Sequence, residues 1–131
     1  MATQYITAVG RRKTAIATVR MIAADKSTVM VNGKSLKDYF KTNERAQVGM
    51  EALNKAESAQ NYTVTAHLVG GGVAAQADAL RHAISRAIIK AEPNTRKTLK
   101  AIGFLKRDPR AKERKKPGLV KARKAKQWSK R

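Results

Sequence analysis

Residues 61–91 read NYTVTAHLVGGGVAAQADALRHAISRAIIKA and hold three structural signals in succession. Over residues 61–69, apolar side chains alternate with threonine and histidine, which predicts a β-strand. The triplet Gly70-Gly71-Gly72 closes that strand, and residues 73–91 carry apolar side chains at helical spacing until Pro93 ends the pattern. We therefore expect a strand that turns tightly into a long helix, with glycines permitting the turn and the close packing.

The residues before this stretch predict three more strands. Segments 3–10 and 14–23 are rich in β-branched residues, and Gly10-Arg11-Arg12-Lys13 joins them, so we expect a hairpin with a basic tip. A short strand over residues 27–31 ends at Asn32-Gly33, a strong turn signal.

Two shorter helices are predicted between the third and fourth strands. Ser35 precedes Leu36 in a capping arrangement for a helix through Phe40, and Asn43 is a plausible N-cap for a helix to about Glu57. A last helical segment over residues 94–102 ends at Gly103. The order β-β-β-α-β-α predicts an α+β fold, a two-layer sandwich with helices against a four-stranded sheet.

Positive charge is concentrated at one end of the chain. The 131 residues carry 29 Lys and Arg against nine acids, a formal net charge of +20. Residues 1–95 hold 13 cations and seven acids, whereas residues 96–131 hold 16 cations and two acids. Because the last segment is poor in apolar residues, we expect a globular domain over residues 1–102 and an extended basic tail over residues 103–131.

The composition restricts the function classes. With no cysteine, disulfides and thiolate zinc sites are excluded, and no apolar stretch reaches signal-peptide or membrane-spanning length, so we expect a cytoplasmic protein. The glycine triplet lacks the Gly-Lys-Ser/Thr of a phosphate-binding loop and the spacing of a dinucleotide fingerprint. Neither paired carboxylates nor metal-ligand spacings appear, so the sequence predicts no enzyme, cofactor or metal.

Several segments together carry a family resemblance. GGGVAAQADALRHAISRAI (70–88), GRRKTAIATVRM (10–21), VNGKSLKDYF (31–40), GFLKRDPRAKERKKPG (103–118) and WSKR (128–131) resemble the bacterial form of the small-subunit ribosomal protein nine family. The match runs in order over nearly the whole chain and is weakest over residues 43–60. Ala75 and Ala83 stand where bacterial members commonly have glycine, and Trp128 stands where they usually have phenylalanine.

The resemblance implies a fold and partners. Members have a left-handed βαβ crossover, are not enzymes, sit in the head of the small ribosomal subunit among other ribosomal proteins, bind ribosomal RNA, and send the tail to the peptidyl-site transfer RNA. Together with the clustering of charge, it gives Ser129, Lys130 and Arg131 as the transfer-RNA contacts. The expected ribosomal RNA contacts are Arg11, Arg12, Lys13, Arg81, His82, Arg86, Arg107, Arg110, Arg114, Lys115, Lys116, Lys121, Arg123, Lys124, Lys126 and Trp128.

Physical chemistry supports an RNA partner for the tail. Each Lys or Arg that neutralises a phosphate releases condensed counterions, and an aromatic ring such as Trp128 can stack on a base. The alternative for Trp128 is packing on the protein's own body. A polybasic membrane binder would need a sustained apolar stripe, which GLVKARKAKQWSKR lacks, and a sequence-specific DNA-binding protein would need a recognition helix.

Overall fold

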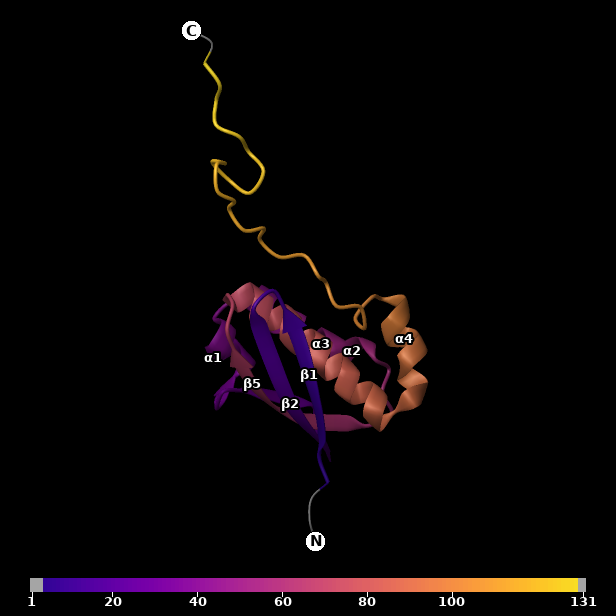
Figure 1. Cartoon of the computed structure of the whole chain (residues 1–131). Helices are drawn as coiled ribbons and strands as arrows, with labels where there is room; N and C mark the ends of the chain where they lie inside the picture. The colour runs from indigo at the N-terminus through magenta and orange to yellow at the C-terminus, as the bar shows by residue number, and fades with distance from the viewer. Residues whose placement is uncertain (1–3, 130–131) are drawn as a thin grey trace.

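The structure is a computed structural model that describes residues 4–129 (Figure 1). Its first two strands form an antiparallel hairpin. Strand β1 (Ile6–Arg12) pairs with β2 (Ala15–Ala24), and Arg12 lies opposite Ala15. Only Lys13 and Thr14 therefore form the turn. The sequence placed Arg11 and Arg12 at the tip, but strand pairing continues through both residues.

The sheet has five strands, one more than predicted. Strands β3 (Thr28–Val31), β4 (Lys34–Ser35) and β5 (Asn61–Val69) complete the order β1-β2-β5-β3-β4. The extra strand, β4, has only two residues, too few to show a period in the sequence. It pairs with β3 through the turn Asn32-Gly33, whose φ angles of 49° and 82° fit a hairpin turn with both central residues in the left-handed region.

The central strand β5 runs antiparallel to β2 and parallel to β3. Since β3 and β5 are adjacent and parallel, the chain between them must cross over, and it does so through β4, α1 (Leu36–Phe40) and α2 (Asn43–Lys55). The left-handed sense of this crossover stays a prediction from the resemblance.

The helix boundaries agree closely with the sequence signals. The Ser35 hydroxyl accepts a hydrogen bond from the Asp38 N–H at 3.3 Å, as the capping pattern predicted. Helix α2 begins one residue earlier than expected, with Thr42 as N-cap instead of Asn43, and it ends at Lys55. It stops short of Glu57 because Glu57 adopts a φ of +52°, which a right-handed helix excludes.

Helix α3 (Val73–Ala91) has the predicted bounds, and a 3₁₀ turn (Pro93–Thr95) links it to α4 (Arg96–Ala101). Gly103 has a φ of +84°, and the N–H groups of Gly103 and Phe104 bond to the carbonyls of Lys100 and Leu99 at 3.1 Å. This is a Schellman motif, in which residue 103 needs a positive φ. Leu99 and Phe104 both belong to the core, so the first residues assigned to the tail are packed on the body.

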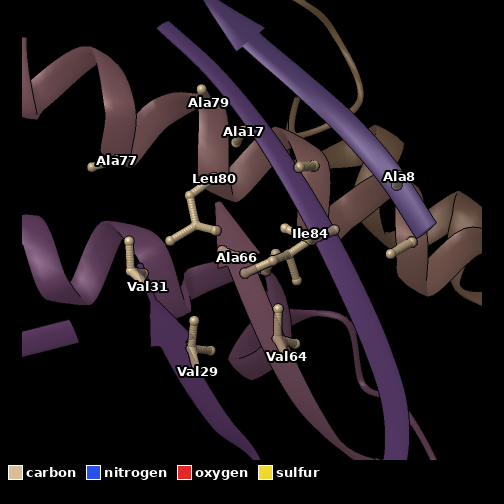
Figure 2. Close-up of a cluster of buried hydrophobic side chains, with 14 of the residues drawn as sticks. Ala8, Ala17, Val29, Val31, Val64, Ala66, Ala77, Ala79, Leu80 and Ile84 are labelled. Carbon is tan, nitrogen blue, oxygen red and sulfur yellow. The ribbon is translucent and has the colours of Figure 1, made fainter. Parts of the chain in front are cut away.

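The core lies between one face of the sheet and helix α3. Leu80 and Ile84 of α3 point toward Val64 and Ala66 of β5 (Figure 2). Helix α3 packs on β1, β2 and β5, and α2 packs against α3. In β2, buried and more exposed residues alternate along most of the strand, so the sheet buries one face and leaves the other open.

The contact between β1 and α3 is very close. A Cβ at Gly10 would lie 2.2 Å from the Ala79 carbonyl oxygen and 2.4 Å from the Ala83 nitrogen. Glycine at position 10 therefore allows the helix to approach the strand. Alanine at position 83, where the resembling family commonly has glycine, is compatible with this approach and is fully buried.

Beyond α4 the chain first stays against the body at Phe104 and then leads away from it (Figure 1). Residues 105–129 form no named helix or strand, and their one isolated bridge joins Leu119 to Ala125. Among the helices that the structure describes, none combines the length and the apolar character that crossing a bilayer requires.

Candidate nucleic-acid interface

The predicted RNA-binding residues of the tail are accessible to a partner. The exposed cationic side chains are Arg107, Arg110, Arg114, Lys115, Lys116, Lys121, Arg123, Lys124 and Lys126. Ser129 is also exposed, whereas Lys130 and Arg131 lie outside the described residues. Trp128 is 79% exposed, so its ring does not pack on the body and presents a free apolar surface.

Only two acids accompany these cations, and both are paired. Asp108 contacts Arg110 at 2.9 Å, and Glu113 contacts Arg123 at 2.9 Å and also Lys116. Hydrogen bonds from Arg110 hold the pKa of the Asp108 carboxyl well below its usual range. Because pairs this exposed contribute little stability, they leave the cations available to phosphates.

The three hairpin residues that were predicted to contact RNA differ in their exposure to solvent. Arg11 and Lys13 are exposed, whereas the Arg12 side chain is only 14% exposed and faces α3. This follows from strand periodicity, because Arg12 shares the face of the buried residues Ala8 and Gly10. The same periodicity, applied to the sequence with β1 extended to residue 12, would have found this orientation.

Three cations of α3, Arg81, Arg86 and Lys90, make contacts within the protein. The Arg86 guanidinium donates to the Val9 carbonyl at 2.6 Å, and the Lys90 ammonium donates to the Thr7 carbonyl at 2.7 Å. Arg81 pairs with Glu51 of α2 at 3.0 Å. These cations therefore tie α3 to its neighbours, a role that the sequence did not indicate.

His82 lies partly buried beside the start of the tail. Its Nδ1 atom is buried and has no hydrogen-bond partner among the described residues. Burial lowers the pKa of His82 below 6.5, and the nearby charges of Arg86, Arg107 and Arg81 lower it further. The imidazole is thus neutral at pH 7, and it does not add to the positive charge of the surface.

A small pocket of about 60 Å³ opens where β1, α3 and the start of the tail meet. This volume admits a few waters or part of a phosphate but not a nucleotide. Its wall combines five cations with two acids: Arg11, Arg12, Arg81, Lys106, Arg107, Asp78 and Asp108.

The glycine triplet serves the fold. Gly70 and Gly71 adopt φ angles of +73° and +63°, and a Cβ at Gly70 would lie 2.5 Å from the Thr14 carbonyl oxygen. The Gln76 amide donates to the Gly70 carbonyl at 2.9 Å and accepts from the Tyr39 hydroxyl at 2.7 Å. The interpretation of the triplet as a tight strand-to-helix turn is confirmed. Residues 4–129 also contain no cluster of three or more His, Cys, Asp or Glu side chains able to hold a metal ion.

The chain is similar over most of its length to proteins of one family. The family model described as ribosomal protein S9/S16 matches residues 10–131. The small ribosomal subunit protein uS9 of Nocardia farcinica is 50% identical over 123 residues, which cover 94% of this chain and 73% of that protein. The protein of the same name from Salinispora tropica is 49% identical over 126 residues, covering 96% and 81% respectively.

Proposed function

The chain belongs to the ribosomal protein S9/S16 family, whose members are structural and non-enzymatic components of the ribosome, and we propose how it acts there. It is a protein of the small-subunit head, in the cytoplasm. Its body and tail bind ribosomal RNA, neighbouring ribosomal proteins surround it, and the end of its tail contacts the peptidyl-site transfer RNA. The names of the relatives support the small subunit, and the resemblance supports the head and the transfer-RNA contact.

The main support for this proposal is the exposed tail, in which nearly all the charged residues are cations. Residues 96–131 contain 16 cations and two acids, and the chain leads away from the body after α4 (Figure 1). Residues 111–131 have a reach of up to about 70 Å if fully extended. Such a segment gains binding free energy from counterion release at each phosphate that it neutralises. Threading along folded RNA is therefore the role that fits its charge and its length.

The body supplies an anchor for the tail. Arg11 and Lys13 project from the hairpin and are free to contact phosphates. Arg86 donates one of its five N–H groups to the Val9 carbonyl, and the other four can still bond to phosphates. We retain Arg81, His82 and Arg86 as proposed ribosomal RNA contacts, and we propose the left-handed sense for the crossover between β3 and β5.

Binding to RNA over a range of salt concentrations tests the proposal. Full-length protein and a variant ending at Arg110 are titrated with small-subunit ribosomal RNA and with anionic vesicles. Removing residues 111–131 deletes ten Lys and Arg, so the magnitude of the salt slope for RNA should fall by several units. Equal slopes for the two proteins, or tighter binding to vesicles than to RNA, would contradict the proposal.

A further inference from the structure

We infer that Arg12 is a positioning residue that clasps the root of the tail, residues 104–110, to the body and so sets the direction in which the tail leaves. Its guanidinium lies 3.7 Å from the Asp78 carboxylate of α3 and 3.4 Å from the Asp108 carboxylate of the tail root. It also donates to the backbone carbonyl of Arg110. One side chain at the end of β1 thus joins three segments of the chain.

A second set of contacts holds the beginning of the same segment. The Phe104 ring is 9% exposed, and the Arg81 guanidinium carbon lies 4.7 Å from its centroid. Lys55 of α2 lies 5.7 Å from the centroid. Arg81 in turn contacts Glu51 and Asp78, so Asp78 is shared by the two arginines. The tail root is therefore fixed at Phe104 by burial and at Asp108 and Arg110 by Arg12.

The charge pattern makes Arg12 the appropriate partner. Asp108 is the sole acid of the tail root, residues 104–110, and cations of the body would otherwise repel that segment. The Arg12 side chain is 14% exposed, so its contacts are less screened by solvent than those of the more exposed pairs at Glu113 farther along the tail. A planar guanidinium offers five donors in a fixed fork and can serve two carboxylates and a carbonyl together, whereas a lysine ammonium has only three donors on a compact point charge.

The clasp has a consequence for binding that rests on the proposed function. A flexible segment from Phe104 to Ala111 would have a root-mean-square length of about 15 Å, and the following residues would spread over a correspondingly large volume. Fixing the root confines the tail to one side of the body and raises its effective concentration at its target. Arg12 thus acts on RNA binding through the direction of the tail.

The clasp is tested on the free, full-length protein, so its failure is separable from failure of the proposed function. The chain has no cysteine, which allows spin labels at Thr65→Cys on β5 and Ala111→Cys after the clasp. Double electron–electron resonance then gives the distribution of distances between them. We expect a narrow distribution in the parent protein and, in Arg12→Gln, a spread on the order of 15 Å.

Matched variants decide the interpretation. Arg11→Gln removes the same charge one residue away, and Arg110→Gln removes the exposed partner of Asp108 while leaving the backbone carbonyl that Arg12 contacts; both should keep the narrow distribution. Asp108→Asn should broaden it, and because Asp108 lies outside the core this variant stays informative if Arg12→Gln fails to fold. A broad distribution in the parent protein, or equal widths in all variants, would overturn the clasp.

Discussion

At the residue scale, the fold depends on a few positions where two backbones approach closely. Gly10 lets α3 lie against β1, and its helical neighbours are the small residues Ala79 and Ala83. Such positions tolerate no added methyl group because a packed interior has no free volume to accept it.

Gly10→Ala should therefore destabilise the protein strongly. The new Cβ meets backbone atoms at 2.2 and 2.4 Å, which cannot rotate away, so we expect a loss of about 3 kcal/mol or more in the free energy of unfolding. Gly72→Ala is the control, because a Cβ there meets nothing within 4 Å and the residue has no positive φ; its effect should stay within about 0.5 kcal/mol. Urea unfolding measures both, and equal stabilities of the two variants would refute the close contact.

His82 gives stability a specific pH dependence. Burial and the charges of Arg81, Arg86 and Arg107 lower its pKa below 6.5, whereas the nearby backbone of Leu105 acts in the opposite direction. The unfolded chain therefore takes up this proton more readily than the folded protein. The contribution of His82 to stability is complete above pH 6.5 and is lost as the pH falls through the lowered pKa.

Thermal unfolding between pH 7.5 and pH 5 measures this effect. The parent protein should lose stability on acidification, and His82→Gln, which stays neutral, should lose less. His67→Gln is the matched control, because it removes an exposed histidine of strand β5. A pH dependence that is the same in His82→Gln as in the parent would show that another group is responsible.

At the scale of elements, the clearest sequence signals gave the most accurate predictions. Strand β5 and helix α3 have the predicted bounds because their periods are regular and because glycine and proline mark their ends. Strand β4 is too short to show a period. Asn32 was predicted as a turn residue, but its amide also pairs with the N–H and carbonyl of Leu68 at 3.0 and 3.1 Å, which lengthens the contact of β3 with β5.

The edge strand β1 is protected by α3. Its carbonyls at Thr7 and Val9 would otherwise be open to another chain, and Lys90 and Arg86 occupy them. Arg86→Ala/Lys90→Ala should therefore promote self-association, with a loss of roughly 1 kcal/mol in stability. The control for the loss of charge is Arg96→Ala/Lys97→Ala, which removes two exposed cations from the first turn of α4.

Sedimentation velocity over a range of protein concentrations, in salt sufficient to screen the net charge, measures self-association. The account predicts a concentration-dependent increase in mean mass for the α3 variant only. If both variants stay monomeric, or if both associate equally, then the cations of α3 do not prevent the edge strand β1 from pairing with another chain.

At the scale of the whole molecule, composition indicated the tail but not how it is attached. The change in charge between residues 1–95 and 96–131 is evident from counting alone. The contact of Arg12 with the Arg110 carbonyl joins residues 98 positions apart. No local sequence pattern indicates that two such distant segments meet. The sequence therefore predicted Arg12 as an RNA contact together with Arg11 and Lys13. Comparing the distance distributions of Arg12→Gln and Arg11→Gln in the free protein separates the clasp from this role.

We propose that the end of the tail contacts peptidyl-site transfer RNA through its phosphates. Deleting Ser129, Lys130 and Arg131 should leave subunit assembly nearly intact, because the preceding cations Lys121, Arg123, Lys124 and Lys126 still anchor the tail. Losing two single-strand phosphate contacts should lower the magnitude of the salt slope for transfer-RNA binding by roughly 1.4, at about 0.7 per phosphate.

The most direct measurement is equilibrium binding of two transfer RNAs with unrelated anticodons to small subunits that carry the full-length or the truncated chain, over a range of salt. We expect a similar loss of affinity for both transfer RNAs, because phosphate contacts do not distinguish sequences. Unchanged affinity for both would contradict the role of the tail, and loss for only one would show that the tail reads bases instead of phosphates.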